Sequence, residues 1–456
     1  MKYDVNYIRR QFPALSLKVN GYPAAFLDGP GGTQVPRRVI DAMVNYLLTA
    51  NANAGGPFLT SQESDRIIGE SRLALADFLG ADPEEVSFGQ NTTTLMFSLA
   101  LALAREDGVQ GAGQGDRHPV PSAGAKDGQR AGQGAGQGTR QGRRNEILVT
   151  QLDHEANRGP WEDLQALGFV VKEARIDPET CSVDLKDFEA KLSEKTRVAA
   201  FGYAANSVGT VSDVKEMTRL AHQAGALTVV DAVHYALHGP LDVKDLGVDF
   251  LLCSAYKFFG PHLGIFYGKK TVYEELPTYR LKVQSAEIPH RIETGTLNHE
   301  GIAGAREAVE FIADVGERFG FRGEKSGREG PGPGEPLSRR QKVVAGMQAM
   351  EAYEQPLADY LRAELAAIKG VKIYGPPKGY RRTSTVSFTM EKLPSGKVSA
   401  ALGEKGIFVW HGHFYASRLI EVLELERYGG LVRVGLSPYN TAEEVERLLQ
   451  EVRRLS

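Results

Sequence analysis

The chain has 456 residues, of which 42% are hydrophobic and 24% charged, a composition typical of a large globular protein of two or three domains. The formal net charge of −3 favours neither nucleic acid nor an anionic membrane as a partner, and no apolar stretch reaches the roughly 20 residues needed to span a bilayer. The charged N-terminus lacks the apolar core of a signal peptide, and two cysteines without metal-type spacing predict no metal site, so we expect a reduced, cytoplasmic setting.

Two segments interrupt the pattern of apolar residues. Residues 106–144 repeat Gly, Gln and Ala, as in "AGQGAGQGTRQGRR", and hold almost no large apolar side chains. Such a composition cannot bury a core, so we expect a disordered insertion, and a tolerated surface loop is favoured over a functional tail. A shorter segment rich in Gly and Pro predicts a second, flexible insertion at 322–336.

Strands and helices alternate along the chain after the first insertion. The predicted strands are "EILVT" (146–150), "FVVKEARI" (169–176), "RVAAFGYA" (197–204) and "ALTVV" (226–230). The helices predicted between them are "ANRGPWEDLQAL" (156–167), "LKDFEAKL" (185–192) and one that begins after the N-cap Asp213 and ends at Gly225. This alternation predicts an α/β fold whose mostly parallel sheet is covered by helices on both faces.

A different pattern follows the second insertion. A long helix at 341–368, a short strand at 384–390 and a final helix at 442–455 indicate a smaller α+β C-terminal domain. We therefore expect an N-terminal segment (1–30) that packs on the small domain, a large domain (31–310) and the small domain (311–456).

Polar residues follow the predicted strands of the sheet. His154 comes after "EILVTQLD", Asn206 after "RVAAFGYAA", and Asp231 after "ALTVV". Ser254 and Lys257 lie at the end of "FLLCSAYK". Each alone has an ordinary explanation, such as a helix cap, a rim residue or a lysine that extends into solvent. Because ligands of parallel α/β sheets bind beyond the carboxyl ends of the strands, their convergence indicates a ligand site.

A pyridoxal 5′-phosphate site would use these groups. Its aldehyde forms a Schiff base with a lysine amine, for which Lys257 is placed. Its pyridine nitrogen needs a carboxylate, which Asp231 supplies, and its flat ring needs a stacking partner, which His154 supplies.

The phosphate of such a cofactor needs backbone donors at a helix N-terminus. The stretch "FGQNTTTLMFSLALAL" predicts a strand, a turn and then an apolar helix opened by Asn91, Thr92 and Thr93. An ordinary N-cap explains the same threonine run equally well when it is taken alone.

Eight motifs occur in a fixed order outside the two insertions: "LDGPGGTQVP", "GQNTTT", "LDHEANRGPW", "ANSVGT", "VVDAVHYALH", "SAYKFFGP", "ETGTLNHEGIAG" and "VRVGLSPYNTAEEVERL". In these motifs the chain resembles the fold-type I, class V aminotransferases, and most of all the group II cysteine desulfurases and their desulfurase-like relatives. The resemblance covers nearly the whole chain outside the insertions. It implies a pyridoxal phosphate enzyme with a large α/β domain and a small α+β domain.

The resemblance also implies a role for each matching residue at the cofactor. Lys257 would be the Schiff-base lysine, Asp231 the partner of the pyridinium nitrogen, and His154 the side chain stacked on the ring. The phosphate would be held by Thr92, Thr93, Ser254 and Tyr256, of which Tyr256 stands where the family usually has histidine.

Four further positions follow from the same resemblance. His234 stands where a glutamine usually meets the ring hydroxyl, and Asn206 is expected near the ring oxygen and the substrate. Thr296, in "ETGT", is expected to reach the phosphate of the neighbouring subunit, which implies a homodimer with shared active sites. Arg433 matches the arginine that binds the substrate carboxylate, a task that suits its bidentate fork.

The loop "GIFVWHGHFYASR" departs from the family. In the desulfurases this loop carries the nucleophilic cysteine, and alignment of Gly412 and His413 places Tyr415 at that position. In the same alignment, Trp410 stands in place of the arginine that precedes the cysteine in the desulfurase loop. A phenol cannot accept sulfur as a persulfide, so Tyr415 would be an acid, a hydrogen-bond donor, a lid or a space-filling aromatic. Neither Cys181 nor Cys253 is an obvious substitute.

These features predict a homodimeric pyridoxal phosphate enzyme acting on a small amino acid, with Lys257 as the general base for the α-proton. Transamination, β-elimination by a C–S lyase and epimerisation all begin with this step, and we favour a transaminase or C–S β-lyase. One alternative is a true cysteine desulfurase that uses another cysteine. An alternative of another class is a cofactor-binding regulator or assembly partner without turnover.

Overall fold

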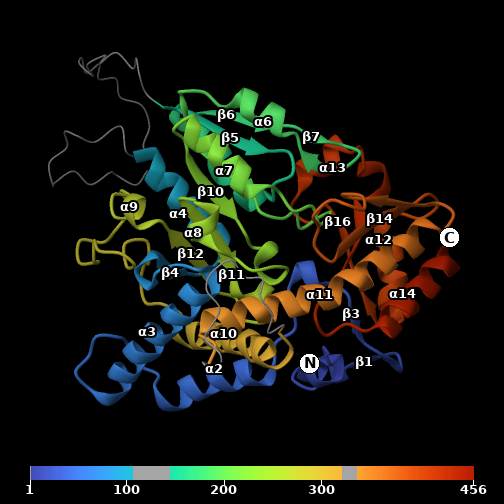
Figure 1. The fold of residues 1–456 in the computed structure, drawn as a ribbon, viewed down its shortest axis with the longest axis horizontal. Helices are drawn as coiled ribbons and strands as arrows, with labels where there is room; N and C mark the ends of the chain where they lie inside the picture. The colour runs from blue at the N-terminus through green and yellow to red at the C-terminus, as the bar shows by residue number, and fades with distance from the viewer. Residues whose placement is uncertain (1, 106–143, 321–335) are drawn as a thin grey trace, which may run out of the picture.

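The computed structural model describes residues 2–105, 144–320 and 336–456 (Figure 1). The insertions expected at 106–144 and 322–336 lie outside the described residues, apart from their last residues Arg144 and Pro336. Their disorder therefore stays a prediction.

A seven-stranded sheet forms the centre of the larger part of the molecule. Its order is β4 (Val86–Gly89), β12 (Gly264–Gly268), β11 (Phe250–Ser254), β10 (Leu227–Asp231), β9 (Thr196–Gly202), β5 (Glu146–Thr150) and β6 (Val170–Ala174). Neighbouring strands are parallel except at β12, which is antiparallel to both β11 and β4. The predicted fold class is confirmed.

Alternate side chains of the strands enter two separate cores, one on each face of the sheet. In β11, Phe250 and Leu252 join one core, whereas Leu251 and Cys253 join the other. The first core is covered by α4 (Thr92–Arg105), α5 (Gly159–Glu162) and α9 (Lys270–Tyr273). The second is covered by α2 (Arg37–Thr49), α3 (Leu59–Leu79), α6 (Leu185–Lys191), α7 (Val214–Gln223), α8 (Val243–Leu246) and α10 (His299–Phe319).

The C-terminal part contains a second, antiparallel sheet in the order β13 (Val371–Tyr374), β14 (Thr385–Met390), β17 (Leu431–Gly435) and β16 (Trp410–Gly412). It shares a core with α12 (Ser395–Glu404), α14 (Ala442–Leu455) and the C-terminal half of α11 (Arg339–Ala366). The N-terminal strand β3 (Ala25–Phe26) pairs with β15 (Ile407–Phe408).

The shorter elements are α1 (Val5–Arg9), β1 (Lys18–Val19), β2 (Tyr22–Pro23), β7 (Ile176–Asp177), β8 (Ser182–Val183) and α13 (Ser417–Val422). The expected domain bounds at 1–30, 31–310 and 311–456 stay predictions.

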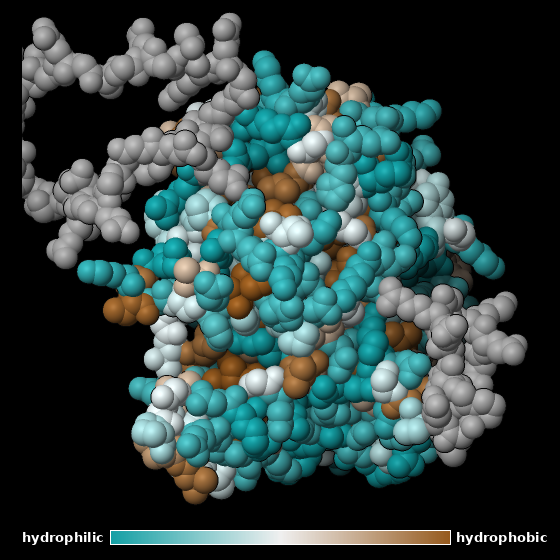
Figure 2. Space-filling view, turned by 60° about the vertical axis from the view of Figure 1, so that its left-hand side comes forward, coloured by the Kyte–Doolittle hydropathy of each residue, from teal (hydrophilic) through white to brown (hydrophobic). Residues whose placement is uncertain are grey.

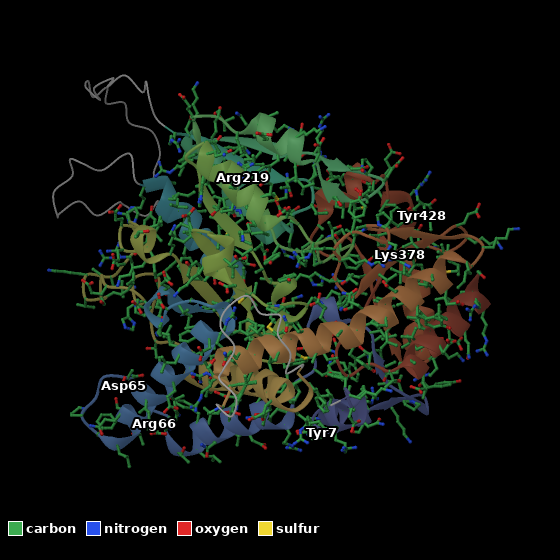
Figure 3. All side chains as sticks on the ribbon, in the orientation of Figure 1. Tyr7, Asp65, Arg66, Arg219, Lys378 and Tyr428 are labelled. Atoms are coloured by element: carbon green, nitrogen blue, oxygen red, sulfur yellow. The ribbon has the colours of Figure 1, made fainter. Side chains whose placement is uncertain are left out.

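The helix α7 illustrates how the pattern of residues sets the packing. Asp213 caps it by accepting a hydrogen bond from the Glu216 amide, and Met217 and Ala221 are buried. The charged Arg219 lies on the solvent side (Figure 3). Gly225, just beyond the helix, has a φ of 72°, as expected for a left-handed helix end.

Two predicted elements differ in extent from the observed ones. Residues 156–167 form the short α5 flanked by 3₁₀ turns. Pro160 lies in the first turn of α5, and the His154 ring caps the preceding turn by accepting from the Ala156 amide. The expected strand 169–176 divides after Ala174, where the Arg175 amide donates to the Asp187 carboxylate instead of a neighbouring strand.

The surface is mostly hydrophilic on the face drawn in Figure 2, with hydrophobic residues in separate patches. Within the described ranges, the structure contains no helix with the length and apolar character needed to cross a membrane.

The helices α10 and α11 pack so closely that their glycines are required. A β-carbon on Gly316 would lie 1.8 Å from the Lys342 carbonyl oxygen, and one on Gly346 would lie 2.1 Å from that of Ile312. The backbone of one helix therefore occupies the space of a side chain on the other.

We predict that Gly316→Ala lowers the free energy of unfolding by about 1–3 kcal/mol, because the helices must separate to admit the methyl group. Gly69→Ala in α3 is the matched control, since a β-carbon there meets nothing within 4 Å. It should be neutral or stabilising by up to about 1 kcal/mol. Urea denaturation of both variants measures the difference, and equal stability of the two would contradict this packing.

Candidate cofactor and active site

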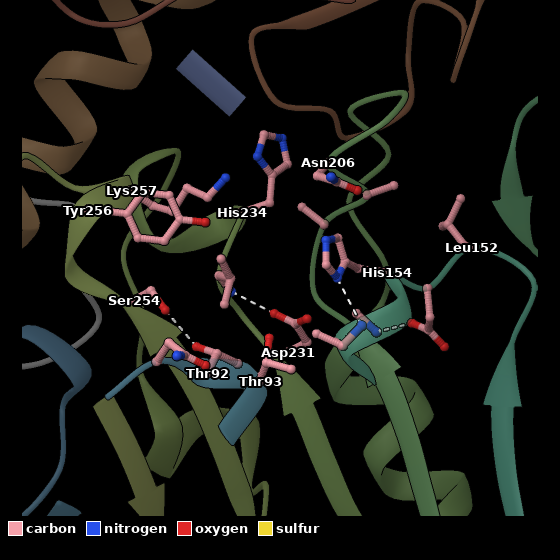
Figure 4. Close-up of a pocket in the computed structure, with 17 residues that line it drawn as sticks. Thr92, Thr93, Leu152, His154, Asn206, Asp231, His234, Ser254, Tyr256 and Lys257 are labelled. Carbon is pink, nitrogen blue, oxygen red and sulfur yellow. Dashed lines mark hydrogen bonds between the residues drawn. The ribbon is translucent and has the colours of Figure 1, made fainter. Parts of the chain in front are cut away.

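One pocket lies beyond the carboxyl ends of β9, β10 and β11 (Figure 4). It is lined by ten of the residues predicted from the sequence: Asn91, Thr92, Thr93, His154, Asn206, Asp231, His234, Ser254, Tyr256 and Lys257. The parallel strands bring these residues together although they span more than 160 positions of the chain.

The N-terminus of α4 and a pair of hydroxyls form one end of the pocket. Asn91 caps the helix by accepting from the Thr94 amide at 2.9 Å. The Thr92 hydroxyl instead lies 2.7 Å from that of Ser254, across the pocket floor. The threonine run is therefore more than an N-cap, and helix N-terminus and hydroxyls together suit a phosphate group.

Asp231 lies at the end of β10 and accepts a hydrogen bond from the Val233 amide at 2.9 Å. Burial raises the pKa of this carboxyl to about 6, although the amide and Lys257 act in the opposite direction. A buried carboxylate of this kind gains stability when a cationic partner, such as a protonated ring nitrogen, lies beside it.

His154 faces the pocket as a neutral imidazole. Its Nδ1 accepts from the Ala156 amide at 3.0 Å, which leaves the proton on Nε2. Burial, and then the charges of Lys257 and Arg433, lower the pKa of His154 to about 4. A neutral flat ring suits stacking on an aromatic cofactor.

Lys257 does not extend into solvent. It is 9% exposed, and its Nζ donates to the Pro30 carbonyl. Burial and then Arg433 lower the pKa of Lys257 to about 7, against the opposing effect of Asp231 and Asp28. Much of this amine is therefore neutral, and nucleophilic, near neutral pH.

His234 and Tyr256 also line the pocket. The Nε2 of His234 lies 3.2 Å from the Thr383 hydroxyl and 3.1 Å from that of Thr385. Burial lowers the pKa of His234, so this ring is also neutral at pH 7. Tyr256 stacks on His262 with ring centroids 5.0 Å apart, and the Lys257 Nζ lies 4.9 Å from its centroid.

Arg433, in β17, lies beside Asn206. Its Nη1 donates to the Asn206 carbonyl at 3.1 Å, and the Phe414 ring covers its guanidinium at 4.1 Å. The buried Nε of Arg433 and Oδ1 of Asn206 have no hydrogen-bond partner among the described residues. A buried guanidinium with a free N–H is suited to a ligand carboxylate.

Arg433, the loop residues and Thr296 are not among the residues that line the pocket. Tyr415 is 65% exposed and stacks on His154 with ring centroids 5.5 Å apart. His413 accepts from the Tyr415 amide at 3.0 Å. Thr296 is exposed and does not line this pocket, and the single chain does not test its expected reach to a second subunit.

Three residues at the site were not predicted from the sequence. Asp28 is a partly buried acid whose buried Oδ1 has no partner among the described residues, and desolvation raises its pKa to about 6 against the effect of its own backbone, Arg433 and Lys257. Asp153 accepts from the Thr150 and Gly202 amides and so joins the ends of two strands. Phe414 covers Arg433. Asp28 follows "AAFL" as Asp231 follows "LTVV", which is the signal that could have found it.

Both cysteines are buried, and neither lines the pocket. Burial raises the pKa of both thiols, so each is protonated at neutral pH and a poor nucleophile. Within the described parts of the chain, no cluster of three or more His, Cys, Asp or Glu side chains could hold a metal ion.

Comparison with known proteins agrees with this geometry. The family model for aminotransferase class-V matches residues 25–114, 131–320 and 342–448. Cysteine desulfurases of Yersinia pseudotuberculosis serotype O:1b (strain IP 31758) and Yersinia pestis (strain Pestoides F) are each 27% identical over 473 residues, covering 100% of this chain and 99% of theirs.

Solved structures show the same fold. The apo cysteine desulfurase of Thermococcus onnurineus NA1 aligns with a TM-score of 0.78 at 25% identity, covering 100% of this chain and 98% of that one. The cysteine desulfurase CsdA of Escherichia coli aligns with a TM-score of 0.76 at 23% identity and the same coverage. Members of this family are pyridoxal phosphate-dependent enzymes, and the pocket residues suit that cofactor. The chain belongs to the class V aminotransferase family of enzymes.

Proposed function

We propose that this chain is a homodimeric, cytoplasmic pyridoxal phosphate enzyme that acts on a free small amino acid as a transaminase or C–S β-lyase. The observation that carries the choice is the pocket itself: it brings Lys257, Asp231 and His154 together but contains no thiol. Tyr415 occupies the loop position at which a desulfurase would present its cysteine.

The cofactor would be attached to Lys257, with its ring between His154 and the β10 end and its nitrogen toward Asp231. Asn91, Thr92, Thr93, Ser254 and Tyr256 would hold the phosphate, and His234 would meet the ring hydroxyl. When bound, pyridoxal phosphate supplies an electron sink that eases the breaking of bonds at the substrate α-carbon.

The protein would supply binding and proton transfer. Arg433 would bind the substrate carboxylate through its unpartnered Nε edge, and Asn206 would lie beside the same substrate. Lys257 would take the proton from the α-carbon, a task for which an amine with a pKa near 7 is matched to neutral pH. Thr296 would complete the phosphate site of the second subunit.

A true cysteine desulfurase is the first alternative, and the desulfurase relatives favour it. The burial of Cys181 and Cys253 argues against it, because a sulfur-accepting thiol must reach the substrate. A cofactor-binding regulator without turnover is the second alternative. The lowered pKa of Lys257 and the unpartnered edge of Arg433 favour an enzyme instead.

We predict that the protein forms no persulfide from isotopically labelled cysteine, and that replacing Cys181 and Cys253 with alanine leaves its native reaction largely intact. Intact-mass analysis after incubation measures the first, and a screen of amino acids for 2-oxo acid and thiol release measures the second. A sulfur adduct on either cysteine, with loss of activity when that cysteine is replaced, would establish the desulfurase alternative.

We also predict the pH dependence of Lys257 in the cofactor-free protein. Because its pKa is lowered to about 7, the neutral amine forms as the pH rises through 7. Trace acetylation followed by mass spectrometry should therefore show its reactivity levelling off above about pH 8. An ordinary lysine becomes steadily more reactive up to a pKa near 10.4. If the reactivity of Lys257 instead keeps rising up to about pH 10, as for an ordinary lysine, that result would contradict its burial.

A further inference from the structure

The loop between β16 and α13 adopts an unusual backbone conformation beside the pocket. Phe414 and Tyr415 have φ angles of 54° and 56°, in the left-handed region that is unfavourable for a non-glycine residue. The conformation is held from two sides. Asn206 Nδ2 donates to the Phe414 carbonyl at 2.9 Å, and the Glu155 amide donates to the Tyr415 carbonyl at 2.6 Å. Strain held in this way at a pocket points to a functional arrangement.

Two aromatic side chains, Phe414 and Trp410, lie beside Arg433, and a third, Tyr415, lies on His154. Phe414 lies on the guanidinium at 4.1 Å. Trp410 is directly opposite Arg433 in the β16–β17 pair, so both side chains leave the same face of the sheet. Trp410 and Arg433 also both lie over Gly31, where a β-carbon would be 2.7 Å from the indole Nε1 and 3.6 Å from the guanidinium Nη2. Tyr415 stacks on His154. We name Trp410, Phe414 and Tyr415 the aromatic collar.

Two members of the collar expose apolar surface next to residues of the proposed site, Trp410 beside Arg433 and Tyr415 on His154. Trp410 is 54% exposed and Tyr415 is 65% exposed, whereas the neighbouring Arg433 is 3% exposed. A carboxylate that binds in the plane of the guanidinium lies beside the Phe414 ring, because that ring covers one face of the same group. The remainder of such a ligand therefore has aromatic surface within reach.

We propose that the collar determines specificity, and that it narrows the proposed substrate class of small, free amino acids to those whose β-carbon carries an apolar or aromatic group. This inference rests on the proposed function and on Arg433 as the carboxylate site. Covering apolar ring surface on both partners stabilises such a ligand over one with a small substituent. A charged or very small side chain gains nothing from the collar.

The test compares S-benzyl-L-cysteine with S-methyl-L-cysteine, which share a reacting centre and charge. Titrations of the holoenzyme, followed at the cofactor absorption band, give the dissociation constant of each. We expect the benzyl compound to bind at least about tenfold more tightly, the smaller end of discrimination by a hydrophobic pocket. Phe414→Ala and Trp410→Ala should bring this ratio toward one, and Trp410→Phe should retain most of it.

The ratio separates specificity from a purely structural role. A variant that only loosens Arg433 weakens both compounds equally and leaves the ratio unchanged, which would overturn the inference. Tyr380→Ala is the matched control, because Tyr380 is 52% exposed on a loop outside the collar and the cofactor pocket. It should keep the wild-type ratio.

The outcomes for the wild-type protein are also distinct. Equal binding of both compounds overturns the collar proposal and leaves the proposed function standing. If neither compound, nor any other amino acid, changes the cofactor band, the proposed function fails and the collar proposal fails with it.

Discussion

The burial of ionisable groups at one edge of the sheet determines which ligand the site can bind. Lys257, Asp231, Asp28 and Arg433 all lie where solvent is largely excluded, and burial is the largest influence on the pKa of each. Burial shifts each group toward its neutral form, and the opposite charges beside it offset only part of that shift. A ligand with an anionic phosphate, a basic ring nitrogen and an aldehyde would meet complementary groups at this edge. Asp231 and Lys257 are there because the parallel strands β10 and β11 end side by side, whereas Asp28 comes from the N-terminal segment and Arg433 from β17 of the second sheet.

Burial also bears on whether the chain can act as a cysteine desulfurase, the activity in which the loop at Tyr415 would carry the nucleophile. A desulfurase needs a reactive thiolate above the cofactor, and the two thiols of this chain are buried and hold their protons. The loop instead holds two residues in left-handed conformations and covers Arg433 with a phenyl ring. The family scaffold is thus retained, and we propose that Tyr415 replaces the residue that defines one of its chemistries. This arrangement is consistent with function residing in the site and not in the fold.

The sequence was sufficient for the sheet, for α7 with its cap and left-handed end, and for ten residues of the pocket. Most of these rest on local rules: buried strands, capping residues, and polar side chains at strand ends. His234 and Tyr256 followed only from the resemblance to a known family. The sequence predicted one continuous helix at 156–167, but the observed helix is broken. The His154 ring caps a separate turn before it, and the periodicity of apolar residues does not reveal such a side-chain contact.

Phe414 and Asp28 were missed for a different reason. The Phe414 carbonyl is held by Asn206, 208 positions earlier in the chain, and Asp28 meets Lys257 only after the N-terminal segment pairs with β15. Contacts between such distant segments depend on how the two sheets dock, which no short motif encodes.

The most direct test of this account is the attachment site of the cofactor. The holoenzyme is reduced with borohydride, digested and analysed by mass spectrometry. The buried, partly neutral amine of Lys257 predicts a single pyridoxyl group on that residue and loss of the label in Lys257→Ala. A label on another lysine, or none at all, would contradict the account.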